Sequence, residues 1–345
     1  MKKIIEVQNR FFAWEYDVLV LATQAALLAT LYSLVYVFYL PNNIAAIWAM
    51  IGVFVNALIQ TVAIKDSHKN RFHGALIIAI SAGVTTFLGS FYSDSFIMMS
   101  ILLIILVPFV GLSSSAKPLS AAIVLFTVDL FIVGSGVPGN LMTALSYGVA
   151  FTFGGLSLCI FGILYAKIFG QKSIVAEKYN FVWRNVLADY KSNTSFSILL
   201  TFVVIMANTI SYKFKMPQGF WIPMTALLIL KSDYDFTRSR MSHRLFGTFL
   251  GSGLAIIVAI VLLSKLMMAL LMFPLLFLIV IAMAKHYGAY TLILTIMVTV
   301  MVNLTQQQGY LIAEHRLIDT ILGTLVVILS LWLVQPLIAK LHEKN

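Results

Sequence analysis

The sequence predicts an all-α membrane protein with about twelve transmembrane helices, arranged as two parallel six-helix repeats. Three observations lead to this fold class: the apolar composition, the length of the apolar runs and an internal repeat. Of the 345 residues, 61% are apolar and only 10% are charged, and the mean hydropathy is +0.97. A soluble chain of this length forms its core with far fewer apolar residues. Most of this chain is therefore expected to lie in a bilayer.

The apolar runs are continuous and about 20 residues long, the length that a helix needs to cross the hydrocarbon layer. Strands of a membrane barrel would instead alternate polar and apolar residues. Helices satisfy their own backbone hydrogen bonds, as lipid requires. The predicted spans are 18–40, 44–64, 72–92, 96–112, 118–137, 141–168, 196–212, 218–230, 245–264, 266–284, 287–303 and 312–334.

The eighth of these segments, 218–230, is the weakest because it is short and carries Pro223, with Pro217 just before it. Proline interrupts the helical hydrogen-bond ladder. We expect a broken or re-entrant helix here, and the sequence leaves open whether it crosses completely.

Basic residues orient the predicted spans. With the N-terminus inside, all but four of the 23 Lys and Arg residues fall in inner segments. Cytoplasmic loops of membrane proteins are enriched in Lys and Arg. Both termini are therefore expected to be cytoplasmic. The four exceptions are Lys213, Lys215, Lys265 and Arg316.

An internal repeat divides the chain. Residues 40–89 and 216–251 share a Pro turn, a Trp-bearing span, a charged loop and a Gly-spaced span. Each half has an even number of spans, so the halves have the same orientation, as in parallel transporter repeats. Equivalent positions are Pro41 and Pro217, Gly74 and Gly247, and Lys117 and Lys285. We predict a first repeat at 1–168, a cytoplasmic amphipathic linker at 169–195 and a second repeat at 196–345.

Three of the charged residues inside the predicted spans are candidates for a function. Asp129 lies near the middle of the fifth span, where a charge is costly and usually faces a cavity or a partner. It is a candidate proton carrier or substrate ligand, or else a hydrogen-bonded aspartate in helix packing. Asp319 follows Arg316 by one turn, so an i,i+3 ion pair explains both. Both are also candidates to line a transport pathway.

A dense group of charges follows the eighth span. Carboxylates and guanidiniums this close together form charge-assisted pairs. They predict a cytoplasmic gate or an anion-gathering vestibule, and the alternative is a solvated positive-inside loop. The gate candidates are Lys231, Asp233, Asp235, Arg238 and Arg244.

Lys117 and Lys285 occupy equivalent repeat positions at the inner ends of spans. Snorkelling to the interface explains each lysine alone. Their equivalence also makes them a candidate pair for attracting anionic substrates.

Other function classes find no support in the sequence. The six histidines have no metal-ligand spacing on one helix, and Cys159 is the single cysteine, so we expect no metal. No GxxxxGK[ST] motif is present, and no nucleophile constellation can be argued. We expect no cofactor, no catalytic residue and no enzyme. The net charge of +10 resides in loops between spans, so no nucleic-acid partner is expected.

Motifs in the second half resemble a known family. Residues 220–255 contain an aromatic-Trp-apolar-Thr span, then Lys-x-Asp-x-x-x-Thr-Arg, then Arg-x-x-Gly-Thr-x-x-Gly. Residues 316–323 read Arg-x-x-Asp-Thr-x-x-Gly. This pattern resembles the fusaric acid resistance protein family, which includes bacterial aromatic-acid exporters. The matching positions are Trp221, Thr225, Lys231, Asp233, Thr237, Arg238, Arg244, Gly247, Thr248, Gly251, Arg316, Asp319, Thr320 and Gly323.

The resemblance implies an exporter of organic anions, such as aromatic carboxylates, in the bacterial inner membrane. We expect the export to be coupled to protons, with Asp129 as the candidate carrier. Ser232 departs from the family's usual Pro, and the large cytoplasmic domain of its longer members is missing. A passive organic-anion channel and a non-transporting membrane scaffold or assembly factor are the alternatives. The expected partners are a small organic anion and the lipid bilayer, and a homo-oligomer is left open.

Overall fold

The fold is given by a computed structural model, which describes residues 2–41, 43–64, 66, 68–169, 190–261, 264–306 and 309–342. Residues 170–189 of the predicted amphipathic linker at 169–195 lie outside the described residues, and the rest of it is helical. All regular structure in the described residues is helical, which confirms the all-α class.

Twelve helices occur in the described residues, one for each predicted span. Ten of them are long and apolar enough to cross a membrane, whereas α4 and α9 are shorter. The six helices of the first half are α1 (Lys2–Phe38), α2 (Ala45–Val62), α3 (His68–Tyr92), α4 (Phe96–Leu112), α5 (Pro118–Ser135) and α6 (Leu141–Phe169). Those of the second half are α8 (Tyr190–Lys213), α9 (Trp221–Ile229), α10 (Tyr234–Val261), α11 (Lys265–Lys285), α12 (Tyr287–Gln306) and α13 (Gly309–His342).

Local sequence sets matching helix starts in the two halves. Ser95 accepts a hydrogen bond from the Met98 amide at the start of α4, and Ser264 accepts one from Met267 at the start of α11. A serine N-cap satisfies a backbone donor that the first turn leaves free. The fourth helix of each half therefore begins with the same device.

The two halves share one packing order. Helix α3 packs against α5 and α6, as α10 packs against α12 and α13. Helix α2 packs on α6, as α9 packs on α13. The halves interlock, because α4 packs on α8 and α11 packs on α1.

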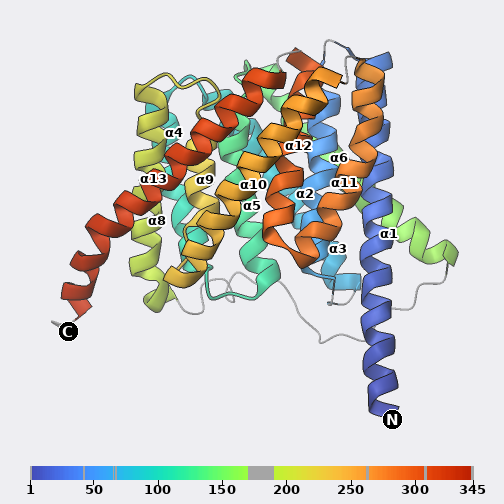
Figure 1. The fold of residues 1–345 in the computed structure, drawn as a ribbon, viewed down its shortest axis with the longest axis horizontal. Helices are drawn as coiled ribbons and strands as arrows, with labels where there is room; N and C mark the ends of the chain where they lie inside the picture. Colours follow the sequence, from blue (N-terminus) through green and yellow to red (C-terminus); the bar gives the residue numbers. More distant parts are fainter. Residues whose placement is uncertain are drawn as a thin grey trace.

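Both chain ends lie on the same side of the bundle (Figure 1), here named the terminal face. The opposite side is named the far face. An even number of crossings requires this arrangement. That the terminal face is cytoplasmic remains a prediction from the basic loops.

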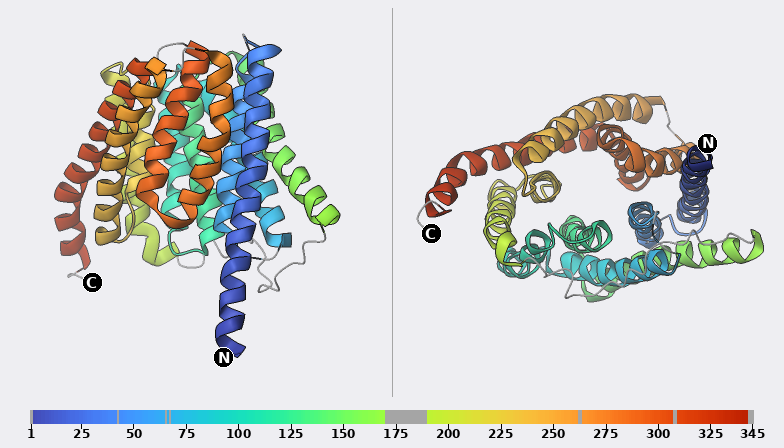
Figure 2. Two further views of the ribbon diagram at one scale, coloured as in Figure 1. Left: turned by 45° about the vertical axis from the view of Figure 1, so that its right-hand side comes forward. Right: turned by 90° about the horizontal axis from the view of Figure 1, so that it is seen from below.

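Helix α9 is the exception among the spans. Its nine residues are all buried, and they extend about 14 Å at 1.5 Å per residue, against a hydrocarbon layer of about 30 Å. The turn before it bends sharply, with φ of 48° at Lys215 and 56° at Gln218. Non-helical backbone at membrane depth is tolerated where it is enclosed by protein or lines a cavity. The weak eighth segment is thus a half-length helix inside the bundle (Figure 2).

Candidate functional site

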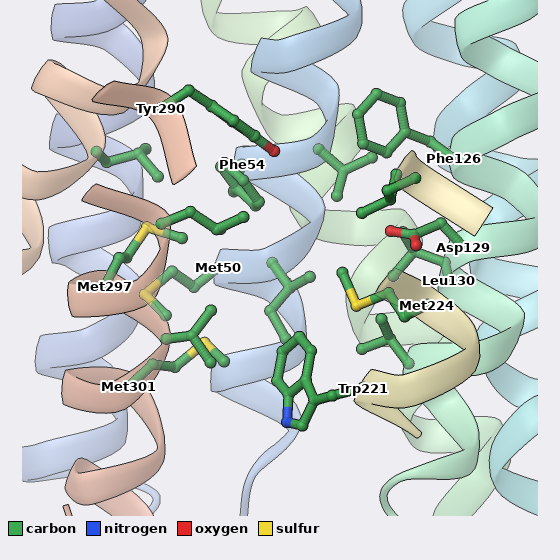
Figure 3. A pocket seen from close by; sticks show the side chains of 17 residues that line it. Met50, Phe54, Phe126, Asp129, Leu130, Trp221, Met224, Tyr290, Met297 and Met301 are labelled. Atoms are coloured by element: carbon green, nitrogen blue, oxygen red, sulfur yellow. The ribbon is translucent and has the colours of Figure 1, made fainter. Parts of the chain in front are cut away.

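A small cavity lies between the two halves. Its volume is about 70 Å³, and its lining comes from α2 and α5 of the first half and from α9, α11 and α12 of the second. The walls are apolar and rich in methionine, with Trp221 and Tyr290 at its two ends and Asp129 at its side (Figure 3). A mostly apolar cavity with a few convergent polar groups is the usual form of a small-molecule site.

A vestibule of about 410 Å³ opens toward the terminal face. Phe126, Leu228 and Tyr290 line both this vestibule and the central cavity, so they form the narrowing between the two. The polar part of the vestibule lining includes Lys231 and Arg240.

A third hollow, of about 440 Å³, lies at the far face around the turn that precedes α9. Phe220 lines this hollow, and the next residue, Trp221, lines the central cavity. The three hollows therefore follow one another from the terminal face to the far face, and α9 runs beside them.

Asp129 lines the central cavity, and its carboxyl group has few hydrogen-bond partners among the described residues. Its side chain is 3% exposed, and its Oδ1 has no hydrogen-bond partner among the described residues. It lies within electrostatic range of Arg244, Lys231 and Arg316. A carboxyl from the first half is therefore under the electrostatic influence of three basic residues of the second half.

Arg316 is buried behind the cavity wall, at 1% exposure. Its guanidinium carbon lies 4.1 Å from the centre of the Trp221 ring, a cation–π arrangement. The i,i+3 ion pair expected with Asp319 is wrong, since neither carboxylate oxygen of Asp319 has a partner within hydrogen-bond distance in the described chain. The aromatic ring competes for the guanidinium, and the two charges interact only at longer range.

Arg244 belongs to the same cluster and not to the loop where the sequence placed it. It is 2% exposed, and its Nε and Nη1 have no hydrogen-bond partner among the described residues. Arg316 also has an unpartnered Nε and Nη1, and the two arginines lie within electrostatic range of each other and of Tyr290. Two buried guanidiniums with free donors form a basic cluster beside the cavity.

In the part of the chain that the structure describes, no ion pair joins the charged side chains of this loop, and the role of these residues as a gate stays a prediction. Asp233 instead caps α10, because its Oδ1 accepts a 2.7 Å hydrogen bond from the Phe236 amide. The Thr237 hydroxyl stabilises the loop by hydrogen bonds. It accepts from the Lys231 amide and is placed to donate to the Lys231 and Asp233 carbonyls. The motif Lys-x-Asp-x-x-x-Thr is thus a helix start.

The remaining gate candidates separate in space. Asp235 and Arg238 are exposed and lie outside the vestibule lining, whereas Lys231 and Asp233 belong to it. Lys231 lies in the connection between α9 and α10, where burial and the nearby Arg240 lower its pKa to about 7, with Asp129 acting in the opposite direction. Lys231 therefore links the vestibule electrostatically to the cavity.

Two functional candidates were missed from the sequence. Arg240 stacks on Tyr287 at 4.3 Å and on Phe236 at 4.9 Å in the vestibule, and only its place in the charged loop hinted at this. Tyr290 has no sequence signal, since its role follows from its position between the vestibule and the cavity.

The lysine pair lies at the rim. Lys117 and Lys285 are both exposed at helix ends, and neither lines the vestibule or the central cavity. Partial burial raises the pKa of Asp66 from its ordinary value, and the charge of Lys117 opposes that rise. The prediction that these lysines attract anions stays a prediction, and it now concerns the surface of the protein.

Comparison of the two repeats shows that the second half has a buried arginine at a position where the first half has a tyrosine. Gly154 of α6 packs on the Ala49 carbonyl, as Gly323 of α13 packs on the Ile222 carbonyl. With these positions matched, Tyr147 stands where the second half has Arg316. Tyr147 stacks on Trp48 at 5.7 Å, as Arg316 stacks on Trp221. The second half thus has a buried charge in place of a neutral ring.

The matched arginines of the two repeats, Arg71 and Arg244, also differ in their partners. Arg71 matches Arg244, since each precedes its matched glycine by three residues. The Nη1 of Arg71 lies 4.0 Å from Asp17 of α1. The Pro41–Pro217 offset matches Asp17 with Asn193, which donates to the Leu112 carbonyl and to Ser115. Arg244 therefore lacks the acidic neighbour that its counterpart has.

Comparison with known proteins agrees with the motifs. An uncharacterized protein of Synechocystis sp. is 49% identical over 43 residues, which cover 12% of this chain and 6% of that protein. No solved structure matches. Together with the motifs, the ten candidate spans support a multi-pass helical membrane protein. The resemblance read from the motifs is confirmed, because residues 195–330 match the family described as fusaric acid resistance protein-like.

Proposed function

We propose that the protein is a transporter, and not an enzyme, that moves small organic anions across the bacterial inner membrane by a proton-coupled mechanism. Aromatic carboxylates are the first substrates to test. Outward movement and the inner-membrane location rest on the family resemblance, and cytoplasmic termini rest on the basic loops.

The observation that carries the proposal is the pair of buried arginines beside the apolar cavity. Arg244 and Arg316 each keep two nitrogens without a partner in the described structure. Burial of an uncompensated charge is costly. A carboxylate that enters from the cavity would supply hydrogen bonds to such donors, while the methionines and Trp221 would contact its apolar body.

The size of the cavity favours a carrier that changes shape. Its volume of about 70 Å³ is about half of the ~150 Å³ of a protein cavity that accommodates benzene. An aromatic substrate therefore requires the narrowing at Phe126, Leu228 and Tyr290 to open. Half-length helices beside a central site are a feature of alternating-access transporters.

Asp129 supplies the proposed link to protons. In the empty site it compensates part of the charge of the arginines. When an anion neutralises Arg244 and Arg316, the Asp129 carboxylate loses the positive charges that stabilise it. A lone carboxylate in an apolar cavity is unfavourable, so the protonated form of Asp129 is then favoured. Proton exchange at Asp129 is thereby linked to occupancy of the site.

Flux in proteoliposomes tests the proposal. The purified protein is assayed with and without a pH gradient against matched aromatic and aliphatic acids. We expect flux of an aromatic carboxylate that increases with the gradient. Equal flux in both conditions would favour the passive channel, and absence of flux by a folded protein would favour the scaffold.

A further inference from the structure

A separate hollow of about 380 Å³ lies in the first half, away from the central route. It is formed by α1, α2, α3 and α6. The C-terminal end of α6 projects away from the rest of the bundle on the terminal side (Figures 1 and 2). The hollow therefore lies beside the helix end that leaves its neighbours.

Among the described residues, the lining of this hollow carries more positive than negative charge. Arg71 and Lys167 contribute two cations, and Asp17 contributes one carboxylate. Asp17 lies at 4.0 Å from Arg71, at the limit of an ion pair. The Nε of Arg71 is buried without a hydrogen-bond partner among the described residues. Arg71 thus brings into the lining a guanidinium whose contact with the Asp17 carboxylate is only at 4.0 Å.

Amide groups complete the polar surface. Gln24 is buried in the wall, and Gln60 donates to the Asn56 oxygen at 2.9 Å. Gln60 has two amide hydrogens, and this bond uses one of them. A ligand in the hollow would meet a guanidinium, an ammonium and an amide donor from three different helices.

The surroundings of the hollow are apolar and face the lipid. Leu19 of α1 and Leu164 and Ile168 of α6 have exposed side chains. Tyr16 and Tyr165 join α1 and α6 through a 3.3 Å contact between their hydroxyls. A polar hollow beside exposed aliphatic helix faces matches a molecule with a charged head and acyl chains.

We propose that this hollow binds the phosphate headgroup of an anionic phospholipid from the leaflet at the terminal face. Arg71 and Lys167 contact the phosphate, and the acyl chains lie along α6 and α1. Basic pockets between transmembrane helices are typical sites for anionic lipid headgroups. Free phosphate shares the headgroup chemistry but would gain nothing from the aliphatic faces.

Native mass spectrometry of the full-length protein in detergent tests the site. Phosphatidylglycerol and phosphatidylcholine with identical acyl chains are titrated, with inorganic phosphate in a third arm. We expect phosphatidylglycerol to bind at least about tenfold more tightly than phosphatidylcholine, and inorganic phosphate not to compete at equal concentration. Lys167→Gln, at an exposed position, should remove most of this preference, and Arg71→Gln together with Lys167→Gln should abolish it.

Lys191→Gln is the matched control, because Lys191 is exposed at the terminal end of α8; it should keep the preference. Equal binding of the two lipids, or a preference that survives Lys167→Gln and the double variant, would overturn the proposal. Full competition by inorganic phosphate would replace the lipid by a soluble anion. An Arg71→Gln variant that fails to fold leaves the Lys167→Gln result to decide.

Discussion

At the scale of single residues, the site depends on charges that the bundle does not neutralise. Asp129, Arg244, Arg316 and Asp319 are all almost fully buried, and each keeps at least one polar atom without a hydrogen-bond partner in the described structure. Structural ion pairs in membrane interiors are usually matched to each other. Buried charged groups without a full set of partners indicate a site that binds a ligand reversibly.

Arg316→Gln should weaken binding of an aromatic carboxylate by about 10- to 100-fold, because a charge-assisted hydrogen bond contributes about 1.5–3 kcal/mol. Binding to the purified protein by calorimetry gives the readout. Arg238→Gln is the control, since Arg238 is exposed and exposed pairs contribute less than about 1 kcal/mol. Equal affinities for both variants and the parent would remove Arg316 from the site.

We expect anion entry to depend on pH through Lys231. Its folded-state pKa of about 7 means that the ammonium is charged below that pH and becomes neutral as the pH rises through it. Initial rates of anion entry from the terminal face, measured without a gradient, should therefore fall between about pH 6 and pH 8. Lys231→Arg keeps the charge and should flatten this profile. The same pH dependence in Lys231→Arg would assign it to another group.

At the scale of elements, the start of α10 shows how a motif can mislead. Five charges in a short loop predict ion pairs, yet Asp233 caps a helix and Thr237 holds the loop by backbone contacts. The sequence alone is compatible with two roles for Asp233, a helix N-cap and an ion pair with a nearby arginine. Only the direction of the backbone decides between them.

Asp233→Asn and Asp233→Ala separate these two roles. Asparagine caps a helix about as well as aspartate, whereas alanine costs about 1 kcal/mol. We expect Asp233→Asn to keep the parent's thermal stability and flux, and Asp233→Ala to lower the melting temperature in detergent. If Asp233→Asn lost flux while it remained as stable as the parent, the carboxylate charge would belong to a gate after all.

Helix α13 must pack closely on α9 to place Arg316 over Trp221. A Cβ at Gly323 would lie 2.8 Å from the Ile222 carbonyl oxygen and 2.8 Å from the Thr225 Cβ. Gly323→Ala should therefore separate the helices, cost about 1–3 kcal/mol and reduce anion binding. Gly253→Ala in α10 is the control, since nothing lies within 4 Å of its added methyl group. Similar melting temperatures for the two variants would contradict this packing.

At the scale of the whole molecule, the sequence predicted the spans better than their assembly. Continuous apolar runs and basic loops are local signals, and each predicted span coincides with one helix. The interlocking of α4 with α8 and of α11 with α1 is a long-range arrangement without a local signal. It joins the two halves, and α5 thereby brings Asp129 toward the arginines of α10 and α13. The sequence identified these residues separately and could not place them together.

We propose above that Asp129 couples the movement of an organic anion to protons. Asp129→Asn keeps the shape of the side chain but cannot titrate. Gradient-driven and downhill fluxes of one aromatic carboxylate, measured side by side in proteoliposomes of parent and variant, test the claim most directly. We predict that the variant folds and binds substrate, keeps downhill flux and loses the flux driven by a pH gradient. Full gradient-driven transport by Asp129→Asn would contradict the account.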